Sequence, residues 1–140
     1  MAHRIRIGNL YGIPLPNSKF AFGRYMRDAS IAIYKHIGND ISDIPKDEDY
    51  QFIVGIYTAD INKDLILIDN LPFENKEHEW PPPTYILDKI SGEYEIYYRG
   101  EINRASKDKC IDMEKASIWH TNHIIDRILG DNKWGTKSKD

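Results

Sequence analysis

Two apolar segments separated by a short break constrain the fold of this chain more than any other feature. Residues 20–27 alternate between two faces, and residues 30–34 form a second run rich in β-branched and aromatic side chains. The Asp28-Ala29 dipeptide between them suits a two-residue turn, so the pattern predicts a β-hairpin. The expected cross-strand partners are Arg27 with Ser30, Met26 with Ile31, Arg24 with Ile33 and Gly23 with Tyr34.

Two residues of this hairpin are unusual for their positions. Gly23 lies opposite a large side chain, which a glycine accommodates because it leaves room above the backbone. Arg24 lies within a largely apolar stripe, where a charge must be paired or must extend to water. We therefore expect structural roles for both Gly23 and Arg24.

Further apolar runs predict more strands. Residues 52–57 are continuously apolar and predict a central strand buried on both faces, and residues 65–68 form a second such run. The other expected strands are an edge strand at residues 13–15, a short strand at 85–86, and a half-buried strand at 94–98 that continues through 101–105. Residues 38–49 and 72–84 are expected to be loops, with a loop or short helical turn at 60–64.

The C-terminal part of the chain predicts one helix. Residues 107–129 contain no proline or glycine, Ser106 is a suitable N-cap and Gly130 a suitable stop. Cys110 falls on the apolar stripe, which favours a small core residue. The expected fold class is α+β: a twisted antiparallel sheet, open or curled into a barrel, with one C-terminal helix packed against it. Residues 1–140 should form a single domain with a frayed tail at 131–140.

Charge and composition exclude several classes of function. The net charge is −3, but residues 1–35 carry six basic side chains against one acidic, residues 36–101 five against fifteen, and residues 102–140 eight against six. An acidic middle argues against a nucleic-acid partner and is compatible with a basic protein partner. Residues 1–8 lack the apolar run of a signal peptide, no stretch resembles a membrane span, and one cysteine allows no internal disulfide. A cytoplasmic protein is expected.

The acidic and aromatic residues of the middle segment are the candidates for partner binding. Loops on a rigid scaffold commonly carry binding residues, and tyrosine and tryptophan dominate binding hot spots. Tyr94 and Tyr98 are instead expected in the core. An acidic surface that only keeps the protein soluble is the alternative. The candidate residues are Asp40, Asp43, Asp47, Glu48, Asp49, Glu77, Glu79, Trp80 and Tyr97.

No set of residues indicates catalysis or a bound metal. His120, His123 and Asp126 are spaced i, i+3 and i+6 on the expected helix, which turns Asp126 away from His120 and favours packing over metal binding. Glu93, Glu95 and Glu101 fit an exposed strand face better than an acid–base pair. We therefore expect no catalytic residue, no metal and no cofactor.

Both ends of the chain carry a family pattern. Gly12-Ile13-Pro14-Leu15, Phe20-Ala21-Phe22-Gly23-Arg24 and Ile31-Ala32-Ile33-Tyr34 form the opening part, and Trp119, His123 and Asp126-Arg127-Ile128 the closing part. With these residues the chain resembles the immunity protein 26 family, whose members protect bacteria from polymorphic toxins. Residues 38–93 match only in strand rhythm. The resemblance implies structural roles for Trp119, His123, Asp126 and Arg127, with no catalytic residue.

Three functions follow from these patterns. The resemblance implies a cytoplasmic antidote that binds one cognate toxin domain by shape and charge, and a nuclease is the toxin class that an acidic protein would suit by analogy. The alternatives are a small-molecule-binding or enzymatic domain with a pocket near His123 and Arg127, and an interaction domain without a toxin. Arg127 is expected to meet a carboxylate or backbone carbonyls of the sheet and so dock the helix, with Asp126 pointing elsewhere. The oligomeric state is open.

Overall fold

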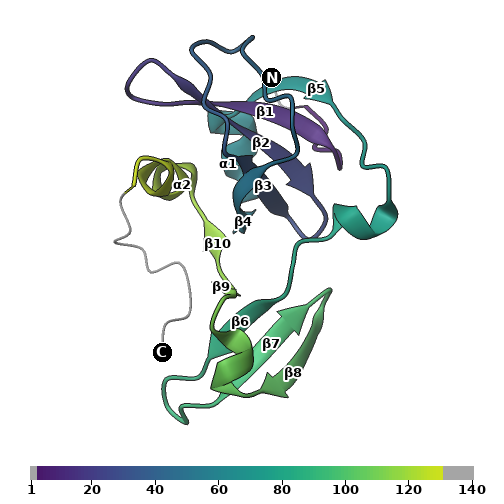
Figure 1. Cartoon of the computed structure of the whole chain (residues 1–140), viewed down its shortest axis with the longest axis vertical. Helices are drawn as coiled ribbons and strands as arrows, with labels where there is room; N and C mark the ends of the chain where they lie inside the picture. Colours follow the sequence, from purple (N-terminus) through teal and green to yellow (C-terminus); the bar gives the residue numbers. More distant parts are fainter. Residues whose placement is uncertain (1–2, 131–140) are drawn as a thin grey trace.

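The computed structural model describes residues 3–130, which form two β-sheets placed end to end (Figure 1). The larger sheet has the strand order β10-β4-β3-β2-β1-β5 and the smaller one β8-β7-β6-β9. The larger sheet comprises β1 (Asn9–Pro14), β2 (Phe20–Met26), β3 (Ser30–Tyr34), β4 (Tyr50–Ile56), β5 (Ile66–Asn70) and β10 (Ile118–Trp119). The smaller comprises β6 (Thr84–Leu87), β7 (Tyr94–Tyr98), β8 (Glu101–Ala105) and β9 (Glu114–Lys115). The helices are α1 (Thr58–Asp64), α2 (Thr121–Ile128) and the 3-10 turns η1 (Lys76–Glu79) and η2 (Lys107–Cys110).

The α+β class is confirmed, with a correction to the expected sheet. The strands form two sheets instead of one, and neither closes into a barrel. The short helix α1 precedes β5, where a loop or short helical turn was expected. The predicted frayed tail at 131–140 lies outside the described residues.

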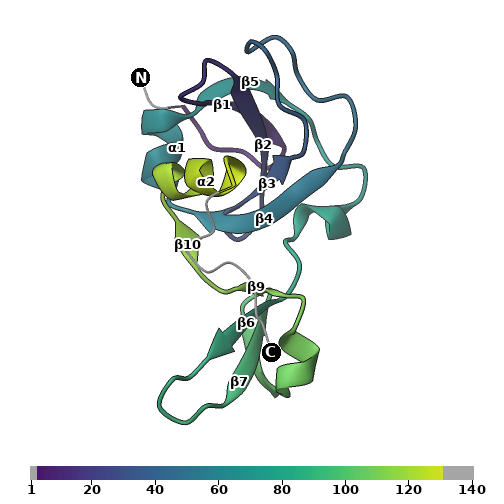
Figure 2. The same ribbon diagram turned by 60° about the vertical axis from the view of Figure 1, so that its left-hand side comes forward.

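The main core lies between the larger sheet and the two helices. Alternate strand residues such as Tyr11, Ile33 and Val54 meet Ile61 of α1 and Ile124 of α2, and all five are buried. Figure 2 shows both helices on the same side of this sheet. The opposite face carries a smaller cluster of Leu10, Phe22 and Tyr34. Since both faces are covered over β1–β3, this sheet is the rigid part of the molecule.

The first hairpin forms as predicted, but its register differs by one residue. Met26 pairs with Ser30 and Gly23 with Ile33, so the loop has three residues, of which Asp28 and Ala29 have φ angles of 64° and 48°. Gly23 is needed for close approach, because a Cβ there would lie 2.5 Å from Cδ1 of Ile31. The prediction of a two-residue turn was therefore wrong. Tyr34 was expected above Gly23, but an isoleucine fills this space.

Three strands differ from the prediction in their place in the sheet or in their burial. β1 is not an edge strand, because it pairs with both β2 and β5. β5 is the edge strand beside β1, and its Ile66 and Leu67 are 41% and 43% exposed instead of buried. β4 is buried on one face only, since Ile53 and Gly55 are half-buried and lie toward the smaller sheet.

The prediction of one long C-terminal helix was wrong. Residues 107–129 form η2, β9, β10 and only then the eight-residue α2. Ile118 and Trp119 pair in parallel with β4, and Glu114 and Lys115 in parallel with β6, so one segment joins both sheets. These tertiary pairings outweigh helix propensity, which is a weak preference. α2 itself packs against the larger sheet, as predicted for the C-terminal helix.

The smaller sheet is a hairpin extended by β6 and β9. Arg99 and Gly100 have φ angles of 51° and 86°, so the chain reverses there and β8 pairs with β7, instead of continuing it. Tyr94 is half-buried, and Tyr98 is 38% exposed, contrary to the expectation of a core residue. Within residues 3–130, no helix has the length and apolar character needed to cross a membrane.

Candidate functional site

A cleft of about 270 Å³ lies where the two sheets meet. β4 forms one wall with Ile53, Val54 and Gly55, and β6 forms the other with Thr84 and Ile86. The remaining lining residues are Asp28, Ser30, Pro81, Pro82, Tyr97, Tyr98, Arg99, Ala116, Ser117 and Ile118. The chain leaves the larger sheet after β5 and returns only at β10, which pairs with β4 at Gly55 and Ile56 alone, so that the rest of this edge of β4 has no neighbouring strand among residues 3–130.

Aromatic and guanidinium groups gather at the rim of this cleft. The guanidinium carbons of Arg27 and Arg99 lie 5.7 and 5.0 Å from the ring centre of Trp80, and that of Arg99 lies 4.9 Å from Tyr98. These distances are within the range of cation–π attraction. Trp80 is therefore held between the two sheets by an arginine from each.

Two glutamates of η1 complete this cluster. Glu79 pairs with Arg27 at 2.7 Å, and Glu77 pairs with Nη2 of Arg99, which holds the pKa of Glu77 below its usual value. The N–H of Arg27 also donates to the carbonyl of Glu79. Both glutamates are thus partnered within the chain, although the Glu77 side chain remains 69% exposed.

Tyr97 links the smaller sheet to the first hairpin. Its hydroxyl donates to Asp28 Oδ2 at 2.7 Å, and this hydrogen bond raises the pKa of Tyr97. Of the residues predicted from sequence, Glu77, Glu79, Trp80 and Tyr97 are therefore brought together at one place.

Arg99 carries a donor that its surroundings do not use. Its Nε is shielded from solvent and has no hydrogen-bond partner among residues 3–130. The rest of the guanidinium is fixed by Glu77 and the two aromatic rings. A buried donor without an acceptor costs about 1–3 kcal/mol, so the other contacts of Arg99 must offset this cost.

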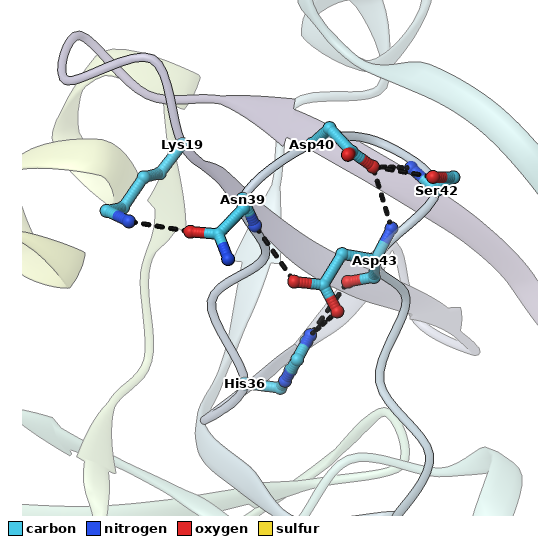
Figure 3. A network of polar contacts seen from close by, with 6 residues as sticks. All are labelled: Lys19, His36, Asn39, Asp40, Ser42 and Asp43. Carbon is cyan, nitrogen blue, oxygen red and sulfur yellow. Dashed lines mark hydrogen bonds and ion pairs between the residues drawn. The ribbon is translucent and has the colours of Figure 1, made fainter.

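The loop at residues 39–49 uses some of its acids to shape itself (Figure 3). Asp40 accepts from the amide and hydroxyl of Ser42, which lowers its pKa, and from the amide of Asp43. Asp43 accepts from the Asn39 amide at 2.9 Å and lies 3.3 Å from the ring of His36. Asp40 and Asp43 therefore fix the loop conformation.

The other end of the same loop is tied down by Arg24. This arginine pairs with Glu48 and donates to the carbonyls of Leu71 and Pro72. Its guanidinium also stacks 3.7 Å above the ring of Phe73. The expectation that Arg24 needs a partner is confirmed, and Arg24 joins the loop at 39–49 to the segment that follows β5.

Two acids of this loop remain at the surface. Asp49 pairs with Lys35 at 3.3 Å, with both side chains more than 60% exposed. Asp47 is exposed and forms no salt bridge with any of residues 3–130. The nine predicted candidates thus separate into the rim cluster and this loop.

The C-terminal residues hold α2 in place. Arg127 makes a two-pronged contact with Glu114 of β9, at 2.9 and 2.7 Å, and stacks 3.9 Å over Phe52. This confirms the expected docking contact. Trp119 is buried, whereas His123 and Asp126 are half-buried on α2.

The carboxylate of Asp60 caps the start of α2. Asp60 accepts from the amide of Thr121 and from His120, both at 3.0 Å. Burial alone would raise the pKa of Asp60, but these two contacts outweigh it and the pKa lies below the usual value. His120 also stacks on Tyr57 at 4.2 Å, so it serves as a structural contact between α1 and α2.

The chemistry of a metal or thiol site is not assembled in this part of the molecule. Among residues 3–130, no three His, Cys, Asp or Glu side chains gather closely enough to hold a metal ion. Cys110 is fully buried, as predicted, and burial raises the pKa of its thiol. A second hollow, of about 330 Å³, is lined by Phe52 and Glu114, but neither His123 nor Arg127 lines either hollow.

The comparisons with known proteins decide the family. The sequence model described as Immunity protein 26 matches residues 6–96, about two thirds of the chain. The chain belongs to the immunity protein 26 family. Neither the curated proteins nor the solved structures gave a significant match.

The family match covers the opening and middle parts of the chain but not the closing pattern. It includes residues 38–93, which sequence reasoning had related to immunity protein 26 only by strand rhythm. It ends before Trp119, His123 and Arg127, so the closing pattern lies outside the matched region. The acidic loop and Trp80 are therefore inside the family region, whereas Tyr97, Arg99 and α2 are outside it.

Several residues of this immunity protein were missed from the sequence. Asp28 was assigned to a turn, Arg99 to a strand, and Asp60 and Glu114 were given no role. For Arg99 a signal existed in the next residue, because a glycine between two strand-like runs is typical of a turn. For Asp60 and Glu114 there was none, since their partners lie 61 and 13 residues along the chain.

Proposed function

We propose that this protein neutralises a cognate toxin by binding it directly. The observation that carries the proposal is membership of the immunity protein 26 family, established by the match over residues 6–96. The toxin is a domain delivered between competing bacteria, and the protein acts in the cytoplasm of the cell that it protects. Neutralisation by binding needs shape and charge complementarity and no catalytic residue.

The charge distribution supports a basic partner. Residues 36–101 hold fifteen of the 22 acidic side chains. Asp47 and Asp49 project from a loop that Arg24 holds on the larger sheet, so they are exposed charges on a fixed support. A nuclease is the class of toxin that we favour, because a groove that binds phosphates is basic. Acidic side chains at its entrance would speed association and exclude the nucleic acid.

Charge reversal on this loop tests the electrostatic part of the proposal. Because the cognate toxin of such an immunity protein is usually encoded nearby, the probe is the toxin domain encoded beside this protein. Asp47→Lys with Asp49→Lys should slow association roughly tenfold at low salt and flatten its salt dependence, because surface charges steer encounter. Glu48 is left unchanged, since a lysine there would face Arg24.

The matched control is Glu93→Lys with Asp108→Lys. It changes the net charge equally, on exposed residues before β7 and in η2 that do not line the cleft. Equal association rates for the two double variants at every salt concentration would show that the loop at 39–49 does not steer the partner. Absence of any complex with the wild-type protein would contradict the proposed function itself.

A further inference from the structure

We propose that the cleft between the two sheets receives a bulky apolar side chain of the toxin, and that the guanidinium of Arg99 donates to an oxygen of the same toxin segment. This inference rests on the proposed function and assigns it a site. It places the anchoring contact at the junction of the sheets, outside the acidic loop.

The size and lining of the cleft fit a single side chain. Sites for drug-sized ligands usually measure about 300–1,000 Å³, and this cleft, at about 270 Å³, lies just below that range. Its walls are mainly apolar, with Ile53, Ile86 and Pro82 among them. Ile118 is 56% exposed at its mouth, although its neighbour Trp119 is buried. An apolar side chain placed here would cover Ile118 and exclude water from both walls.

Arg99 supplies the polar complement. It lines the cleft with a side chain that is 27% exposed, and Trp80, Tyr98 and Glu77 hold its guanidinium in place. A guanidinium held in one position at the edge of a cleft is complementary to a carbonyl or carboxylate oxygen. A toxin segment that brings such an oxygen adds a charged hydrogen bond to the apolar contact.

The residue types around the cleft are those of a protein-binding hot spot. Tryptophan, tyrosine and arginine are enriched where truncation costs most, especially around a pocket that becomes dry on binding. Tyr97 and Arg99 line this cleft and Trp80 packs against Arg99, and the contacts with Arg27, Asp28 and Glu77 already fix their conformations. A preordered site loses little side-chain entropy when the partner arrives.

The test is the affinity for the toxin domain encoded beside this protein. We expect Ile118→Arg, which places a charge at the mouth, and Arg99→Lys, which replaces the planar guanidinium by an ammonium group, each to raise Kd by at least about tenfold. Leu67→Arg is the matched control: it places the same charge on an apolar residue of 43% exposure at the opposite edge of the larger sheet. The control should change Kd by less than about twofold.

Thermal unfolding of each variant separates binding from folding. Should Ile118→Arg fold poorly, Ile118→Ser removes the apolar contact without adding a charge and should also weaken binding. A wild-type complex whose Kd is unaffected by Ile118→Arg, Ile118→Ser and Arg99→Lys would overturn the cleft as the site. A wild-type protein that forms no complex would instead contradict the proposed function.

Discussion

The side chains of Arg127 and Arg24 are both buried, but their carboxylate partners differ in exposure. Arg127 pairs with Glu114, and the two side chains are only 9% and 11% exposed. Arg24 is as deeply buried, but its partner Glu48 is 59% exposed. Removing Arg127 therefore leaves a buried carboxylate unpaired, whereas removing Arg24 leaves Glu48 in water.

We therefore predict that Arg127→Ala is the more damaging of two matched substitutions. It should lower the free energy of unfolding by about 3–5 kcal/mol, the cost of breaking a buried ion pair from one side. Arg24→Ala should lower it by about 1–3 kcal/mol, through lost charged hydrogen bonds to Leu71 and Pro72. Urea unfolding measures both values. Equal small effects would contradict the role of the Arg127–Glu114 pair in docking α2.

Asp60 makes the stability of the α1–α2 contact dependent on pH. The folded protein holds the pKa of Asp60 below its usual value of 3.8, so the charged form favours the folded state. The contribution is complete above that value and is lost as pH falls through the lower folded pKa. Asp60→Asn should therefore destabilise the protein at pH 7, and the difference from wild type should shrink below about pH 4.

Thermal melts of wild type and Asp60→Asn between neutral and acidic pH measure this difference. Asp47→Asn is a control, because the Asp47 side chain is exposed and forms no salt bridge with any of residues 3–130. A gap between wild type and Asp60→Asn that stays constant down to the lowest pH would exclude the charge of Asp60 as its cause.

Secondary-structure elements were predictable where their signal is local. The period-two pattern identified β2, β3 and β7, and the positions of Gly and Pro marked the loops between strands. The strand register was not predictable, because the sequence at Asp28-Ala29 suits a three-residue loop as well as a two-residue turn. A loop longer by one residue changes every cross-strand partner. The helix at 107–129 failed because β9 and β10 are two-residue parallel pairings whose partners, β6 and β4, lie far away in the sequence.

The revised C-terminal segment predicts the effect of one cap substitution. Ser106 precedes η2 but its side chain makes no capping hydrogen bond. Ser106→Ala should therefore leave the free energy of unfolding unchanged, whereas an N-cap of a long helix would cost about 0.5–2 kcal/mol. Asn75→Ala is the positive control, because the Asn75 side chain accepts from the amide of Glu77 at the start of η1. A loss at Ser106 as large as that at Asn75 would favour the long helix.

At the scale of the whole molecule, the two sheets differ in how well they are buried. β2 and β3 are buried almost throughout, whereas β7 is half-buried and β8 mostly exposed. The candidate site lies between the well-packed sheet and the less packed one. Its existence could not be predicted from the sequence, because it depends on the return of the chain through residues 114–119.

This difference predicts uneven amide hydrogen exchange. Amides of β2 and β3 should exchange only on global unfolding, and those of β7 and β8 sooner, by local opening. Binding of the toxin domain in the cleft should slow exchange in β7 and at residues 116–118. Uniform protection of both sheets in the free protein would contradict the description of the smaller sheet as the less stable part.

The central claim is that this immunity protein acts by binding a toxin, and bacterial growth tests it most directly. The toxin domain encoded beside this protein is expressed with either the wild-type chain or the Ile118→Arg variant. The account predicts that wild type restores growth and co-purifies with the toxin domain, and that the variant protects less at equal abundance. Growth arrest that the wild-type protein does not relieve, with no complex recovered, would contradict the claim.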